Sequence, residues 1–164
     1  MWGRSSLEAR KADMHVVTAS AAETQALARS LARVVEPGTV IALEGDLGAG
    51  KTTFTQGLAG ELGALEPVAS PTFVLMRVYK GRLPIYHFDA YRLEGSHQLD
   101  DLDADEYLWG DGLCVVEWAS RIADALPPDR IEVVLAHAGD DRRSITVEAT
   151  GPVHARMLAR LEPS

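Results

Sequence analysis

Short apolar runs alternate with stretches of helical period along most of this 164-residue chain. The apolar runs are often β-branched, and such runs predict buried strands. They occupy residues 15–18, 39–43, 113–116, 131–136 and 144–149. No repeat, low-complexity tract or linker interrupts the pattern, so we expect a single domain over residues 14–164.

The stretches between these runs predict helices. Ser20 and Glu23 have the spacing of a capping box that begins the first helix, and Pro37-Gly38 ends it. In the second helix, apolar residues recur at every fourth position from Phe54 to Leu62 and stop at Gly63. Two shorter helices are expected at residues 122–126 and 152–161.

Residues 74–79 and 82–87 flank Lys80-Gly81 and predict a β-hairpin with a two-residue turn. An antiparallel hairpin makes the sheet mixed. Just before it, Pro71 excludes the helical conformation at Ser70, so residues 68–73 are expected to form an extended loop.

Residues 98–109 contain five acidic side chains and a partial helical period, and they predict an acidic surface helix. This charge has two interpretations. It can be a solvated helix face, or it can be a docking surface for a basic partner.

The stretch from Gly45 to Thr52 fits the phosphate-binding P-loop pattern G-x-x-x-x-G-K-T. It follows an apolar run and precedes a helical stripe, as such a loop requires. Its backbone N–H groups and the helix N-terminus form a cup for an anion. Lys51 is expected to reach the β- and γ-phosphates, and the Thr52 hydroxyl to ligate Mg²⁺.

Two acidic residues, Asp89 and Glu117, follow apolar or β-rich runs, and carboxylates at strand ends are the usual further ligands of a P-loop Mg²⁺. Either residue can hold Mg²⁺ or orient the attacking water. The alternative for Asp89 is a turn residue or a partner of Arg92.

Three nearby residues have roles that the sequence leaves open. His87 can be a base, a phosphate contact or a structural histidine of the sheet. Thr72 can sense a γ-phosphate or simply begin a strand. Trp118 is expected to lie half in the core and half on the surface, with closing of the site or contact with a partner as the alternative. Tyr91 and Trp109 are expected to be packing residues.

Acidic residues outnumber basic ones by 24 to 16, which gives a net charge of −8. This charge disfavours direct binding to RNA or DNA, which needs a basic face. The single Cys114 excludes an internal disulfide and suits a reducing cytosol. No apolar stretch is long enough to predict a membrane span. Residues 1–13 lack the apolar core of a signal peptide and are expected to be a disordered tail.

The nucleotide is expected to be ATP. Guanine is usually read by an Asn/Thr-Lys-x-Asp motif downstream of the P-loop, but the chain has no Asn and its only Lys-x-Asp is Lys11-Ala12-Asp13. A P-loop small-molecule kinase is the alternative function. Such enzymes generally carry an Arg-rich lid, whereas residues 93–120 contain no Arg or Lys.

Four motifs then occur in order: the P-loop with Thr53-Phe54, Ser70-Pro71-Thr72-Phe73, His87-Phe88-Asp89-Ala90-Tyr91-Arg92-Leu93, and Glu117-Trp118. Together they resemble the TsaE (YjeE) family, the ATPase subunit of the bacterial machinery for tRNA threonylcarbamoyladenosine. The resemblance covers roughly residues 15–150. One departure is Phe73, where many relatives have Tyr.

The resemblance implies a P-loop NTPase-like, three-layer α/β fold whose mixed, mainly parallel central sheet is flanked by helices. It implies a cytoplasmic protein that binds ATP, hydrolyses it slowly with Mg²⁺ and works with the TsaD and TsaB subunits. The modified adenosine lies next to the tRNA anticodon, and tRNA is contacted only through the complex.

The implied catalytic residues are Lys51, Asp89 and Glu117, and the implied metal ligands are Thr52, Asp89 and Glu117. The expected nucleotide contacts are Gly45, Asp46, Leu47, Gly48, Ala49, Gly50, Lys51, Thr52, Thr53 and Thr72.

Overall fold

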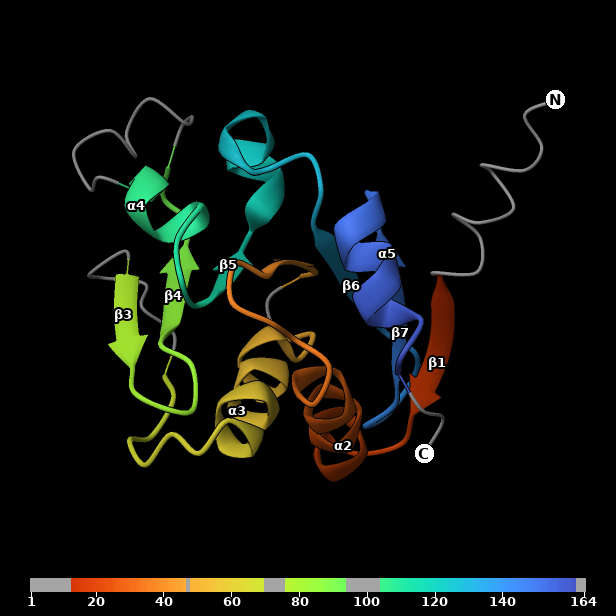
Figure 1. The fold of residues 1–164 in the computed structure, drawn as a ribbon. Helices are drawn as coiled ribbons and strands as arrows, with labels where there is room; N and C mark the ends of the chain where they lie inside the picture. Colours follow the sequence, from red (N-terminus) through yellow and green to blue (C-terminus); the bar gives the residue numbers. More distant parts are fainter. Residues whose placement is uncertain (1–12, 47, 70–75, 94–103, 162–164) are drawn as a thin grey trace, which may run out of the picture.

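The structure is a computed structural model that describes residues 13–46, 48–69, 76–93 and 104–161 (Figure 1). Its strands are β1 (Met14–Thr18), β2 (Val40–Glu44), β3 (Met76–Tyr79), β4 (Ile85–Asp89), β5 (Leu113–Glu117), β6 (Ile131–His137) and β7 (Arg143–Ala149). Its helices are α2 (Ala21–Ala32), α3 (Lys51–Glu61), α4 (Ala104–Leu108), the 3₁₀ helix η2 (Ala119–Ala125) and α5 (Pro152–Leu158).

The seven strands form one sheet in the order β1-β7-β6-β2-β5-β4-β3. Strand β2 lies at its centre, parallel to both β6 and β5, and β4 is parallel to β5. The pairs β1–β7, β6–β7 and β3–β4 are antiparallel. Only β7 and β3 therefore run against the other strands, which confirms the expectation of a mixed, mainly parallel α/β sheet.

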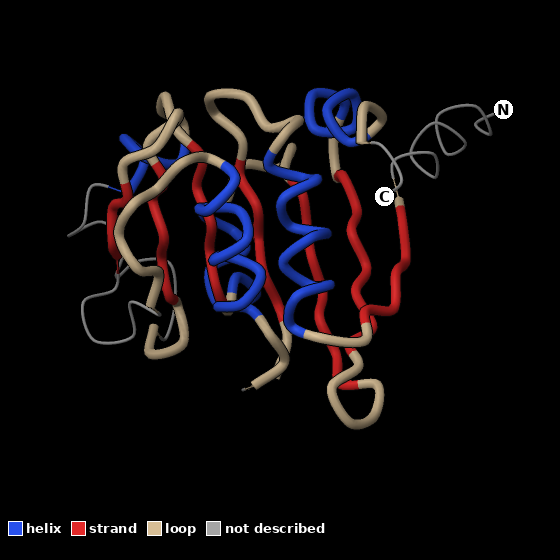
Figure 2. Tube along the Cα trace, turned by 90° about the horizontal axis from the view of Figure 1, so that it is seen from below, coloured by secondary structure: helices blue, strands red, loops and turns tan. Residues whose placement is uncertain are grey.

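Helices α2 and α3 lie side by side over one face of the sheet (Figure 2). Phe54 of α3 and Leu31 of α2 belong to the large apolar core on this face. Gly57 lets the two helices approach closely, because a Cβ atom there would lie 2.8 Å from the Cβ of Ala28. The packing of α3 against α2 fixes the position of the P-loop at its start.

The expected cap of α2 is confirmed. The Glu23 N–H donates to Ser20 Oγ at 3.2 Å, and the Glu23 carboxylate accepts from the Ala19 N–H at 2.8 Å. The capped end of α2 lies next to the end of β1, where the buried hydroxyls of Thr18 and Thr24 are 2.7 Å apart.

The opposite face of the sheet is covered by α4 and η2 over β2, β5 and β4, around Val116, Ile122 and Leu108. Over β6 and β1 the same face is open in the part of the chain that the structure describes, since Val134 and Val17 are 47% and 54% exposed. None of the described helices is both long and apolar enough to cross a membrane.

The predicted hairpin is confirmed as β3 and β4, but the prediction of a two-residue turn between them is wrong. Tyr79 pairs with Ile85, so residues 80–84 form the loop. The Arg82 N–H donates to the Leu62 carbonyl at 2.6 Å, and a Cβ on Gly81 would lie 2.5 Å from that oxygen. The packing of this loop against the end of α3 therefore determines how long the loop is.

Two other expectations need correction. Trp109 is 65% exposed and is not a packing residue. The acidic helix is described only as α4, because residues 98–103 lie outside the described residues. The predicted tail (except Asp13) and most of the loop at 68–73 also lie outside them.

Candidate functional site

The P-loop connects the end of β2 to the start of α3, and all three of its glycines, including Gly45 at φ +155°, adopt backbone conformations that other residues rarely adopt. Gly48 has φ +79° and Gly50, which precedes α3, has φ +109°. The Ala49 N–H donates to the Asp46 carbonyl at 3.0 Å, which closes the turn. Of the expected loop contacts, Leu47 lies outside the described residues.

Lys51, the first residue of α3, is 5% exposed and folds back over its own loop. Its ammonium donates to the carbonyls of Gly45 and Asp46, the latter at 3.1 Å. It also lies 4.1 Å from the centroid of the Trp118 ring, a cation–π contact. The next two residues, Thr52 and Thr53, are half-buried at the start of the helix.

The sheet brings the two predicted acids together. Asp89 ends β4, Glu117 ends β5, and the two residues are register partners on neighbouring parallel strands. Asp89 is 4% exposed and Glu117 is 3% exposed. Asp89 Oδ1 also accepts the Tyr91 N–H at 2.9 Å, so Asp89 stabilises the turn after its strand as the alternative suggested.

Electrostatics connects these acids to the P-loop lysine. Burial lowers the pKa of Lys51 below its ordinary value, and carboxylates oppose that shift in the order Glu117, Glu44, Asp89 and Asp46. Both predicted acids are therefore within electrostatic range of the P-loop, at the edge where β2, β4 and β5 end.

His87 lies on β4, two residues before Asp89. It is completely buried, and its Nε2 is 2.6 Å from Glu117 Oε2. Of the roles that the sequence left open, this position favours a contact with the acid over a direct contact with phosphate.

Trp118 covers the lysine from the side of β5. It is half-buried and has φ +58°, a strained conformation for a bulky residue. Its ring centroid is 4.9 Å from that of Tyr91, so Tyr91 packs as expected although it is 37% exposed. The sequence predicted a half-buried Trp118 but not its contact with Lys51.

Arg143 of β7 is a site residue that the sequence did not reveal. Its guanidinium donates to the carbonyls of Ala49 at 3.1 Å and Gly48 at 3.2 Å, and thereby holds the P-loop from outside. No motif marks Arg143, and only the pairing of β7 with β6 brings it to the loop.

A cavity of about 270 Å³ adjoins the P-loop on the side of α2 and β7. This volume is near the lower end for small-molecule sites, about 300 Å³. Its lining is mixed in polarity and consists of Ala21, Thr24, Gly48, Gly50, Thr53, Asp141 and Arg143.

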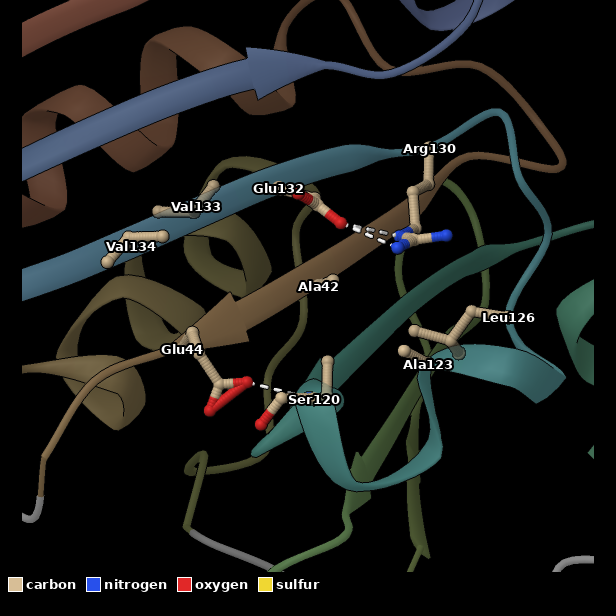
Figure 3. A pocket seen from close by; sticks show the side chains of 10 residues that line it. Ala42, Glu44, Ser120, Ala123, Leu126, Arg130, Glu132, Val133 and Val134 are labelled. Carbon is tan, nitrogen blue, oxygen red and sulfur yellow. Dashed lines mark hydrogen bonds and ion pairs between the residues drawn. The ribbon is translucent and has the colours of Figure 1, made fainter. Parts of the chain in front are cut away.

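A second cavity, of about 180 Å³, lies on the other face of the sheet between β2, β6 and η2 (Figure 3). Its floor is apolar, and the Arg130–Glu132 ion pair stands at its rim. There Glu44 accepts the Ser120 N–H at 2.7 Å, which joins the start of the P-loop to η2.

A cation at this site would need ligands from a bound nucleotide as well as from the protein. Among the described residues, no three His, Cys, Asp or Glu side chains are grouped to hold an ion without other ligands. P-loop proteins hold Mg²⁺ with a loop hydroxyl, a carboxylate and phosphate oxygens. Thr52, Glu117 and Asp89 are the available protein donors, whereas Thr72 lies outside the described residues.

The chain is similar to known proteins over most of its length. Residues 18–145 match the family model "Threonylcarbamoyl adenosine biosynthesis protein TsaE". Two relatives carry the name "tRNA threonylcarbamoyladenosine biosynthesis protein TsaE". The one from Bacillus subtilis is 50% identical over 82% of this chain and 84% of its own length. The one from Treponema pallidum is 43% identical over 82% and 99%, respectively.

A crystal structure of Bacillus subtilis YdiB has the same fold as this chain. It superposes with a TM-score of 0.81 at 42% identity, and the match covers 91% of this chain and 93% of that one. The family match and these relatives agree with the series of motifs read from the sequence. The chain therefore belongs to the TsaE family.

Proposed function

We propose that this protein binds ATP and hydrolyses it with Mg²⁺, as the ATPase subunit that supports threonylcarbamoyl transfer to the adenosine next to the tRNA anticodon. The observation that carries the proposal is the convergence at one sheet edge of a buried P-loop lysine with two buried acids from neighbouring strands. This arrangement suits phosphoryl transfer to water.

Binding is assigned to the P-loop. Its backbone N–H groups hold phosphate oxygens, and Lys51 leaves the carbonyls of Gly45 and Asp46 to pair with the β- and γ-phosphates. The adjacent cavity, with Thr53 and Arg143 in its wall, offers room for the rest of the nucleotide.

Hydrolysis is assigned to the two acids. Water attacks the γ-phosphorus, the bond to the β–γ bridging oxygen breaks, and ADP and phosphate leave. Asp89 and Glu117, with Thr52, hold the cation or orient the water. When bound, Mg²⁺ neutralises the charge that develops on the phosphates.

The pathway is assigned from the relatives' names, the indirect contact with tRNA from charge, and the partners TsaD and TsaB from the family resemblance alone. Relatives named for tRNA threonylcarbamoyladenosine biosynthesis support a role in that modification. A protein with a net charge of −8 is poorly suited to binding the negatively charged tRNA directly. We therefore place the protein in the cytoplasm with TsaD and TsaB, through which it acts on tRNA.

The test compares wild type with Lys51→Ala. Wild type should bind ATP, release free phosphate and support repeated rounds of tRNA modification with TsaD and TsaB. The variant should unfold at a similar temperature but lose nucleotide binding and all rounds after the first. Unimpaired multiple turnover by the variant would refute the ATPase role. Transfer of labelled phosphate to a metabolite would indicate a kinase instead.

A further inference from the structure

His87 and Glu117 form a buried pair on neighbouring strands, behind the P-loop. The imidazole is 0% exposed, and the Glu117 side chain is 4% exposed. The contact between Nε2 and Oε2 is 2.6 Å, slightly shorter than the usual about 2.7–2.9 Å of a charge-assisted N–H···O hydrogen bond. We assign Nε2–H as the donor in this pair, because an ionised carboxylate can only accept.

The second ring nitrogen, Nδ1, indicates that packing alone does not explain why a histidine occupies this position. Among the described residues, His87 Nδ1 is the buried side-chain polar atom without a hydrogen-bond partner. An unpaired buried nitrogen is destabilising, and an apolar residue of similar size would avoid it. The surroundings are those of a core position, with the Tyr79 ring centroid 6.0 Å from the imidazole. The histidine therefore contributes its Nε2–H donor to Glu117.

Glu117 needs a hydrogen-bond donor such as His87 because Lys51 lies nearby. Of the four acids that raise the pKa of Lys51 against the effect of burial, Glu117 has the largest effect, so the Glu117 carboxylate and the Lys51 ammonium attract each other. An unrestrained glutamate could turn to pair with the ammonium. The bond from His87 holds Oε2 and leaves Oε1 for a ligand.

We propose that His87 is a positioning residue that holds the Glu117 carboxylate for the cation and water of the bound nucleotide. This inference rests on the proposed function. Partners that orient a metal-ligating side chain typically contribute 10–100-fold to metal affinity or activity. His87 acts through Glu117 and touches no substrate.

The test uses two substitutions at this position. His87→Leu fills the space without a donor, and His87→Gln places an amide N–H near the position of Nε2. The first readout is the affinity for a fluorescent, non-hydrolysable ATP analogue, measured with Mg²⁺ and with EDTA. In EDTA both variants should bind as wild type does. With Mg²⁺, the gain in affinity should fall roughly tenfold in His87→Leu and be largely restored in His87→Gln.

The second readout is kinetic and spectroscopic. His87→Leu should raise the KM for Mg²⁺–ATP roughly tenfold, in step with the lost affinity, and should also lower kcat, because the carboxylate that His87 holds acts on the reacting end of the nucleotide. In ¹⁵N spectra of the wild type, the His87 ring should carry its proton on Nε2, and Glu117→Gln should shift that signal.

Each outcome decides the proposal. A full Mg²⁺-dependent gain in His87→Leu would overturn the positioning role while leaving the proposed function intact, and equal impairment of both variants would reduce His87 to a packing residue. If wild type itself showed no gain with Mg²⁺, the proposed function would fail and this inference with it.

Discussion

Replacing Arg143 by alanine tests whether β7 holds the P-loop in its binding conformation. The guanidinium donates to the Gly48 and Ala49 carbonyls, and this is its link to the loop. Alanine removes both bonds but leaves the strand pairing of β7 unchanged. Lysine at the same position keeps the charge but cannot bond both carbonyls with a planar fork.

The expected magnitude follows from the two bonds. Arg143 is half-buried, so each bond is worth about 1 kcal/mol and not the larger values of fully buried charged pairs. Their sum of about 2 kcal/mol corresponds to roughly thirtyfold weaker nucleotide binding, if the bonds serve to order the loop. Arg143→Lys should fall between alanine and wild type.

The assay is titration calorimetry with Mg²⁺ and ATP, together with thermal unfolding. Arg142→Ala is the matched control, since it makes the same change of charge at the neighbouring, exposed residue. Arg142→Ala should bind as wild type does. Equal affinity of Arg143→Ala and wild type would refute the assignment of Arg143 as a support of the loop.

Three further outcomes are expected. Glu117→Gln and Asp89→Asn should bind ATP yet lose about 100-fold or more in phosphate release, because each removes a carboxylate from the reacting end. Burial alone would raise the pKa of Asp129, but hydrogen bonds from the α5 N-terminus and from the His154 ring outweigh burial and lower it. Because the folded pKa lies below the unfolded pKa, the ionised Asp129 carboxylate stabilises the fold at neutral pH, and this stabilisation is lost in acid. The thermal unfolding midpoint should therefore drop below about pH 4, and it should drop less in Asp129→Asn. Burial raises the pKa of Cys114 to about 12, so a thiol reagent at pH 8 should modify it only after unfolding.

The sequence predicted the parts of the site that local patterns determine. The P-loop is a contiguous motif, and Asp89 and Glu117 follow runs that read as strands. Because parallel strands end at one edge of a sheet, their positions in sequence were enough to bring both acids to the loop.

What the sequence missed depends on contacts between distant residues. Arg143 reaches the loop across 94 positions, and Lys51 meets Trp118 only because β5 lies beside β2. The prediction of a two-residue turn at Lys80-Gly81 was wrong because the Arg82 N–H donates to the Leu62 carbonyl, at the end of a helix distant in sequence. Tertiary contacts of this kind override the local turn signal.

The charges around Lys51 explain how such a site can favour a nucleotide that arrives with its cation. Four carboxylates, from Glu117, Glu44, Asp89 and Asp46, act on this one ammonium. A free triphosphate would add several more negative charges beside them, and at short range such charges repel by about 1 kcal/mol or more for each pair. In the proposed function, a divalent cation on the phosphates would convert Glu117 and Asp89 from repelling neighbours into ligands. The acids that would disfavour bare ATP are therefore the ones expected to favour Mg²⁺–ATP, and their burial makes the discrimination larger than it would be at the surface.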